Sequence, residues 1–246
     1  EYLNLAVHNI LNKDLNETVY RTEVHSRVSD LRIYGTYILH PSLDDVLLKT
    51  HIDKDSVRYT TNTGIWIESR GDISTINEIP YMYYLRRLEL ARQHISDLKP
   101  LEGMKLTRLN LADNFVGNLL PIKDIVSLTS LDICQNPVRD LWPISRLLSI
   151  KELDISQTQV TDLTPLKELT KLESLYLAYC NVQDISILAG LSNLKEVDIS
   201  NTKVKDLSPL LRSENPITVY CEGIPDEVLD KVRNKPDIIL IDNSGK

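Results

Sequence analysis

The chain has 246 residues, of which 42% are hydrophobic and 26% are charged, and its formal net charge is −7. This length suits one large domain or two small ones, and the composition is ordinary for a globular protein. Non-specific nucleic-acid binding needs a basic surface that displaces counterions, so the negative charge argues against a nucleic-acid partner. No apolar run approaches the roughly 18–20 residues that cross a bilayer, so we expect no membrane span.

The first 27 residues predict a helical cap. Their apolar residues recur at helical spacing: Leu3, Val7, Ile10, Leu11 and Leu15. Such a helix would cover the exposed end of a core formed by the residues that follow. Residues 28–36 then fit the pattern L-x-x-L-x-L-x-x-T. Residues 37–63 interrupt it and predict an insertion, with a short helix and an irregular or extended piece, before a strand resumes at residues 65–67.

From Leu85 to Leu210 one sequence pattern occurs six times. The apolar residue that opens each copy follows the previous one by 21 residues and then by 22 four times over: Leu85, Leu106, Leu128, Ile150, Leu172 and Leu194. A period near 22 with L-x-x-L-x-L before Asn, Thr or Cys is typical of a leucine-rich-repeat solenoid. We therefore predict an α/β fold, a right-handed solenoid with a parallel concave sheet and short 3₁₀ or helical convex turns.

The position within a copy assigns a role to each residue. Positions 4 and 6 point inward on a short strand, and positions 3, 5, 7 and 8 are expected to point outward on the concave side. Position 9 is a short polar residue or cysteine that can bond the backbone of the turn. The following Asp-Leu-x-Pro-Leu segment predicts a capped tight turn on the convex side, because Asp accepts free N–H groups and Pro fixes φ.

The end of the chain predicts a second cap. Ile217, Val219 and Cys221 still alternate as core residues, residues 225–234 predict a helix, and residues 238–241 predict a last strand. The expected organisation is one domain over 1–246, with an N-terminal cap at 1–27, repeats at 28–215 and a C-terminal cap at 216–246.

The 22-residue copies with N-x-x-D-L-x-P-L resemble the bacterial internalin-type leucine-rich repeats, a class shared with a eukaryotic regulator of phosphatase 1. The resemblance covers residues 85–215 closely and residues 1–36 and 64–84 more loosely. It implies a non-enzymatic protein that binds a macromolecular partner, such as a host receptor, on its concave face. Internalins continue into an immunoglobulin-like joining domain, whereas residues 216–246 here predict a helix-strand cap.

The concave positions are polarised, with arginines in the early copies and carboxylates in the later ones. Trp66, Tyr176 and Tyr179 depart from the repeat and belong to residue types enriched in interface hot spots. We predict a partner-binding surface formed by Trp66, Arg87, Arg92, Arg108, Asp132, Glu152, Asp154, Tyr176, Tyr179, Glu196 and Asp198. Trp142, on the convex side, is expected to pack sideways on a neighbouring copy.

The three cysteines show no disulfide or metal-ligand spacing, which favours a reducing compartment. We therefore favour the cytoplasm or delivery to a host cytosol, with the cell surface or secretion as alternatives. No phosphate-binding loop, dinucleotide fingerprint or nucleophile elbow appears, so we expect no cofactor, no metal site and no catalytic residue. The expected protein is a monomer with a protein partner.

Two other functions stay open at this stage. The solenoid could be a scaffold or delivery domain of a longer protein. It could also be a carbohydrate-acting enzyme, because Asp132 and Asp154 would stand about 5 Å apart on neighbouring strands, within the carboxylate spacing of a retaining glycosidase. The tripeptide Arg70-Gly71-Asp72 matches a recognition sequence for integrins, which is a short motif with a high chance frequency.

Overall fold

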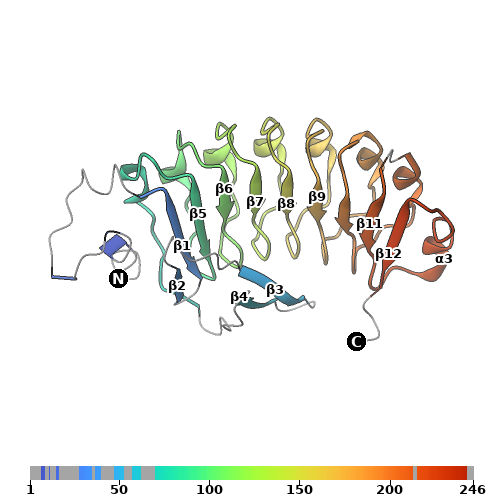
Figure 1. The fold of residues 1–246 in the computed structure, drawn as a ribbon, viewed down its shortest axis with the longest axis horizontal. Coiled ribbons are helices and arrows are strands. Elements are labelled where there is room, and N and C mark those ends of the chain that lie inside the picture. The colour runs from blue at the N-terminus through green and yellow to red at the C-terminus, as the bar shows by residue number, and fades with distance from the viewer. Residues whose placement is uncertain are drawn as a thin grey trace.

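The computed structural model shows a curved, open solenoid with a sheet on one side and short turns on the other (Figure 1). It describes residues 7–8, 11, 15–16, 28–34, 70–212 and 215–242 in full, and residues 37–39, 47–52 and 57–61 as backbone strands. Among these residues, no helix has the length and apolar character needed to cross a lipid bilayer. The predicted fold class is confirmed.

The concave sheet has ten strands in the order β12-β11-β10-β9-β8-β7-β6-β5-β1-β2. All neighbouring pairs are parallel except β1 with β2. The strands are β1 (Asp30–Tyr34), β2 (Tyr37–Leu39), β5 (Arg87–Ala91), β6 (Arg108–Asn110), β7 (Ser130–Asp132), β8 (Glu152–Asp154), β9 (Ser174–Tyr176), β10 (Glu196–Asp198), β11 (Ile217–Tyr220) and β12 (Ile238–Ile241). Each strand pairs with the same positions of the next copy, so equivalent residues form straight rows across the sheet.

The convex side consists of 3₁₀ turns, one for each coil. They are η1 (Ile79–Tyr81), η2 (Lys99–Leu101), η3 (Leu120–Ile122), η4 (Trp142–Ile144), η5 (Thr164–Leu166), η6 (Ser186–Gly190) and η7 (Ser208–Arg212). Six of them, η1 to η5 and η7, carry Pro at the second position. The residue at the repeat's Asp position accepts a bond from the N–H two residues later, as Asp97 does from Lys99 at 2.8 Å. The predicted role of this position is therefore confirmed.

The core is one continuous stack of aliphatic side chains between the sheet and the 3₁₀ turns. Leu88, Leu109, Leu131, Leu153, Leu175 and Val197 occupy position 4 of successive copies and are almost fully buried. Each coil contacts its two neighbours, as expected for a repeat protein whose coils cannot bury their apolar faces alone. Cys180 and Cys221 are buried in this stack, as the sequence predicts.

Position 9 bonds the buried backbone of the turn in two ways. The Asn114 and Asn136 side-chain amides each donate to three main-chain carbonyls and accept one N–H from the preceding coil. Thr158 and Thr202 instead donate their hydroxyls to the carbonyls of Ile155 and Ile199 at 2.7 Å. The position therefore stabilises every turn, and asparagine also links two coils.

Position 8 adopts a left-handed backbone conformation in all six regular copies, with φ between 53° and 59°. The residues are Arg92, Asp113, Gln135, Gln157, Tyr179 and Asn201. A left-handed conformation costs a side chain other than Gly, Asn or Asp about 1–2 kcal/mol. The repeated N–H bonds of the turn hold it, as in Asp113 N–H to the Cys134 carbonyl at 2.9 Å.

The segment before residue 70 differs from the prediction. β1 pairs directly and in parallel with β5, with Arg32 opposite Glu89. The strand predicted at residues 65–67 lies outside the described residues. Within residues 37–63, the sequence predicts a short helix and an irregular or extended piece. β3 (Leu47–Ile52) and β4 (Val57–Thr61) form an antiparallel hairpin there, so these described residues are extended rather than helical. The β-branched and alternating residues of this segment favour strands.

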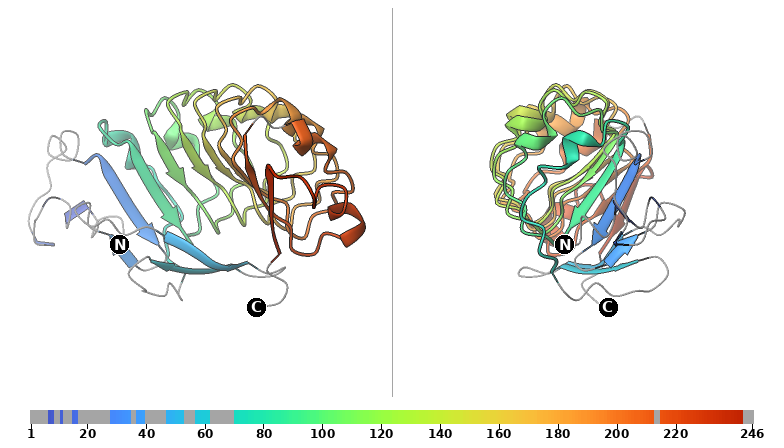
Figure 2. Two further views of the ribbon diagram at one scale, coloured as in Figure 1. Left: turned by 45° about the vertical axis from the view of Figure 1, so that its right-hand side comes forward. Right: turned by 90° about the vertical axis from the view of Figure 1, so that its left-hand side faces the viewer.

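The hairpin lies on the opposite side of the molecule from the 3₁₀ turns, below the strand ends of the concave sheet (Figure 2). The N-terminal cap lies largely outside the described residues. Of its predicted apolar face, Val7 and Leu11 are helical and buried, whereas Leu15 is exposed and does not join the core.

At the other end, β12 pairs in parallel with β11 and completes the sheet as predicted. The helix is shorter than predicted, because α3 covers only Asp226–Leu229 and turns follow it. Pro225 precedes the helix with φ −59° and ψ 140° rather than forming its first turn. Val228, Leu229 and Val232 are buried and cover the end of the core.

Candidate functional site

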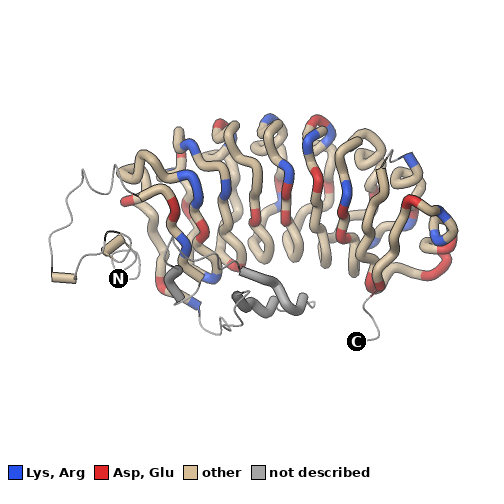
Figure 3. The backbone as a smooth tube through the Cα atoms, viewed as in Figure 1, with Lys and Arg blue, Asp and Glu red and all other residues tan. Residues whose placement is uncertain are grey.

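The outward rows of the concave sheet are positions 3 and 5. From β7 to β11 these ten residues include five carboxylates and two tyrosines and contain no Lys or Arg. They are Ser130, Asp132, Glu152, Asp154, Ser174, Tyr176, Glu196, Asp198, Thr218 and Tyr220. Charged residues of both signs lie along the solenoid (Figure 3), whereas the charged residues at positions 3 and 5 of β7 to β11 are all carboxylates.

The early arginines are paired with carboxylates of the chain itself. Arg87 Nε lies 2.6 Å from Glu89 Oε1, and Arg108 NH2 lies 3.2 Å from Glu152 Oε2, two strands away. Arg92 lies 3.6 Å from Asp113 and occupies the turn after β5 rather than the strand. The predicted basic half of the surface is therefore largely neutralised from within.

The first two coils are closed on their outward side. Arg32 and Glu89, both at position 5, are only 2% and 3% exposed, and the Tyr34 hydroxyl donates to the Glu89 carboxylate. Arg32 also lies 2.9 Å from Asp30. The pKa of Tyr34 is raised, first by burial and then by the adjacent Glu89. Trp66 lies outside the described residues, so its predicted role stays a prediction.

Position 7 does not face outward as predicted. Its residues are small and buried: Ala91, Ala112, Cys134, Ser156, Ala178 and Ser200. The backbone begins its turn here, since position 8 is left-handed, and the short side chain is enclosed by neighbouring coils. Tyr179 is likewise in the turn after β9, so it does not share a strand with Tyr176.

Asp132 and Asp154 do stand opposite each other on β7 and β8. Each carboxylate accepts a main-chain N–H two residues later, at 3.0 Å from Cys134 and 2.8 Å from Ser156. Ligand atoms of Asp132, Cys134 and Asp154 lie within 4.8 Å of one another. The backbone bonds explain the two aspartates as parts of the strand ends.

The tyrosines surround the carboxylates of β10. Asp198 is in register with Tyr176 on one side and with Tyr220 on the other. The Tyr176 hydroxyl donates to Glu196 Oε2 at 2.8 Å, and Tyr220 also bonds Glu196. Burial and then this bond raise the pKa of Tyr176, so the phenol stays a hydrogen-bond donor at neutral pH. Glu196 is thereby held in one place.

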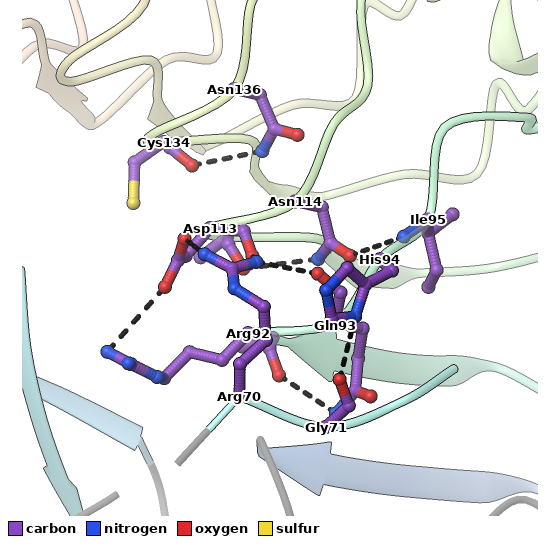
Figure 4. Close-up of polar contacts among 12 residues, drawn as sticks. Arg70, Gly71, Arg92, Gln93, His94, Ile95, Asp113, Asn114, Cys134 and Asn136 are labelled. Atoms are coloured by element: carbon purple, nitrogen blue, oxygen red, sulfur yellow. Dashed lines mark hydrogen bonds and ion pairs between the residues drawn. The ribbon is translucent and has the colours of Figure 1, made fainter. Parts of the chain in front are cut away.

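Residues 70–73 are fixed to the turns of the next two coils (Figure 4). Arg70 NH1 donates to the carbonyls of Gln93 at 2.6 Å and Asp113 at 2.7 Å, and its NH2 pairs with the Asp113 carboxylate. Its guanidinium also lies 5.3 Å from the ring centroid of Phe115. The arginine of the Arg-Gly-Asp tripeptide is therefore engaged within the protein.

On the convex side, Trp142 begins η4 and is 56% exposed, so its ring is only partly covered. With Leu120 of η3 it lines a cavity of about 420 Å³.

The chain resembles solved leucine-rich-repeat structures over most of its length. Residues 170–212 match the family model for Leucine Rich repeats (2 copies). An internalin (InlF) from Listeria monocytogenes has a TM-score of 0.69 at 20% identity, over 90% of this chain and 56% of its own. Internalin C2 from the same organism has a TM-score of 0.63 at 25% identity, over 89% and 92%. This chain has an internalin-like leucine-rich-repeat fold. A comparison with curated proteins finds no match for the sequence.

Sequence reasoning missed one residue of this internalin-like concave face, Tyr220. The last copy departs from the repeat, so only its inward residues were assigned. Because Val219 is in register with Val197, the alternation already placed Tyr220 beside Asp198. Extending the position-5 row from Asp198 to the next strand would have identified Tyr220 from the sequence.

Asp198→Asn is expected to raise the stability of the solenoid at pH 7 by about 0.5–1 kcal/mol, the size of a carboxylate interaction at this spacing. The pKa of Asp198 is raised, first by burial, with Asp154 and Glu222 adding to the rise. The asparagine oxygen can still accept the Ser200 N–H bond, 2.8 Å long. A raised pKa penalises the ionised form, so the gain should vanish as the pH falls below about 3.9, the unfolded value.

Asp162→Asn is the matched control with the opposite sign. Bonds from Thr164 lower the pKa of Asp162, so its ionised form contributes stability that is present above the unfolded pKa and lost as the pH falls. The asparagine variant should therefore be less stable than the wild type at pH 7. Urea denaturation at pH 7, 5 and 3 measures both; equal behaviour of the two variants would contradict this assignment.

Proposed function

We propose that this protein is a non-enzymatic interaction module that binds a protein partner on the later half of its concave face. Leucine-rich-repeat proteins, internalins among them, act as protein-interaction modules. The Arabidopsis receptor kinase HAESA, another similar structure at 16% identity and a TM-score of 0.51, was solved with a peptide hormone ligand. The resemblance to Listeria internalins supports a bacterial interaction or virulence role.

The observation that carries the proposal is the contrast between the two halves of the sheet. The early coils bury their charges or pair them with each other, as Arg87 does with Glu89. The outward positions 3 and 5 of β7 to β11 instead present five carboxylates and two tyrosines and contain no Lys or Arg, and one of these carboxylates, Glu152, is paired with Arg108. Tyrosine buries a large area for little loss of rotamer entropy, which suits an interface anchor. Tyr176 and Tyr220 depart from the aspartate that the repeat itself favours at position 5.

The test removes aromatic anchors from one face at a time. Tyr176→Ala with Tyr220→Ala should reduce capture of the protein's partner by at least about tenfold, which is the loss expected when interface anchors are removed. Tyr83→Ala with Trp142→Ala removes two exposed aromatic side chains from elsewhere and should capture as the wild type does. Quantitative capture with each purified variant, checked by thermal unfolding, decides the matter. If capture is instead lost in the variant with Tyr83→Ala and Trp142→Ala and kept in the variant with Tyr176→Ala and Tyr220→Ala, the interface does not lie on the concave sheet.

A further inference from the structure

The carboxylates of β10 and the tyrosines beside them have a geometry suited to a cation. Tyr176, Asp198 and Tyr220 are consecutive members of one row. Neighbouring strands are about 4.8 Å apart, so the backbones of the two tyrosines are about 10 Å apart, with Asp198 between them. Glu196 lies in the adjacent row and is held by the Tyr176 hydroxyl. Two carboxylates thus lie between two aromatic side chains on an open sheet face.

The chain supplies no cation for these groups in the part that the structure describes. The outward residues of β7 to β11 contain no Lys or Arg, and Glu222 adds a further carboxylate after β11. The nearest concave arginines belong to β5 and β6 and are paired with Glu89 and Glu152. Attraction between the carboxylates and a partner is therefore not cancelled locally.

We propose that this part of the concave face binds an Arg- or Lys-rich segment of a protein partner, with a cationic side chain seated over Asp198 and Glu196 between Tyr176 and Tyr220. This inference rests on the proposed concave-face function and specifies the partner's chemistry. A guanidinium can bond a carboxylate through two N–H groups, and both cations are attracted to aromatic faces. The open strand rows, rather than a closed pocket, suit an extended segment with repeated basic side chains.

The probe is a synthetic peptide of alternating Arg and Gly, with a peptide in which citrulline replaces each Arg as its neutral isostere. The wild type should bind the Arg peptide at least about tenfold more tightly than the citrulline peptide, with affinity falling as salt rises. Asp198→Asn with Glu196→Gln should abolish that preference, because the shape and the accepting oxygens remain while both charges are lost. Fluorescence anisotropy at low and physiological salt measures each affinity.

The matched control is Asp124→Asn with Glu168→Gln, which changes the net charge equally at exposed positions away from this row. It should keep the preference for the Arg peptide to within about twofold, since screened charges act weakly over distance. Equal losses in both double variants, or equal binding of the two peptides by the wild type, would overturn the inference. If the natural partner is lost with Tyr176→Ala and Tyr220→Ala but retained by Asp198→Asn with Glu196→Gln, the inference fails while the concave-face function stands.

Discussion

Asn136→Ala should lower the free energy of unfolding by about 3–5 kcal/mol, among the largest effects of a single substitution. The Asn136 side chain is 3% exposed. Its amide donates to the carbonyls of Leu111, Ile133 and Cys134 at 2.8, 3.2 and 3.0 Å, and its oxygen accepts the Val116 N–H at 2.8 Å. Alanine removes this partner from all four groups. The Cys134 and Leu111 carbonyls keep the Asp113 N–H and the Asn114 amide as donors, whereas the Ile133 carbonyl and the Val116 N–H lose this bond, and each unsatisfied buried group costs about 1–3 kcal/mol.

Two further variants separate this role from loss of volume. Asn136→Thr should cost about half as much, because Thr158 shows that a hydroxyl in this position still bonds the carbonyl three residues earlier. Asn118→Ala removes one bond, to the Leu120 N–H, at an exposed site and should cost about 1 kcal/mol or less. Urea denaturation gives the energies, and hydrogen exchange should show loss of protection at the Val116 amide. A similar cost for Asn136→Ala and Asn118→Ala would contradict the assigned role.

The repeat made this role of Asn136 predictable from sequence, since six copies show which positions are inward, polar or turning. The same regularity predicted the parallel sheet, the 3₁₀ side and the facing pair Asp132 and Asp154. The repeat did not predict the left-handed backbone at position 8. The residue there varies from Arg to Asn between copies, and the sign of φ does not affect the periodic pattern of hydrophobic residues. The repeat also did not predict the hairpin of β3 and β4, because no second copy of residues 37–63 exists for comparison.

The candidate site was predictable in composition but not in pairing. The sequence predicted concave arginines in the early coils and concave carboxylates in the later ones. Arg87 and Arg108 do lie on concave strands, whereas Arg92 lies in the turn after β5. Contacts between coils, such as Arg108 with Glu152, join residues 44 positions apart and depend on rotamers that no pattern specifies. As a result, the charge available to a partner is mainly the negative charge of the later coils, although the sequence indicates a face with one basic and one acidic half.

Arg70→Ala should lower the free energy of unfolding by about 2–3 kcal/mol, because it removes the guanidinium that joins residues 70–73 to two coils. Asp113, whose side chain is 6% exposed, would lose its closest cation and two nearby carbonyls would lose a donor. Arg92, 3.6 Å from Asp113, limits the loss by remaining near the carboxylate. Urea denaturation measures the effect, and Asp72→Ala, at an exposed position in the same tripeptide, should leave the energy within about 0.5 kcal/mol.

A double-mutant cycle decides whether Arg70 acts through Asp113. Arg70→Ala combined with Asp113→Asn should cost less than the sum of the single variants, since either change alone already breaks the ion pair. Arg70→Lys should fall between wild type and alanine, because an ammonium keeps the charge but cannot donate to the Gln93 carbonyl, the Asp113 carbonyl and the Asp113 carboxylate with one planar group. Additive energies would instead assign the stabilisation to the carbonyl bonds and to Phe115. In either case Arg70 is held by the fold, so a receptor that reads Arg70-Gly71-Asp72 must first break contacts that stabilise the solenoid.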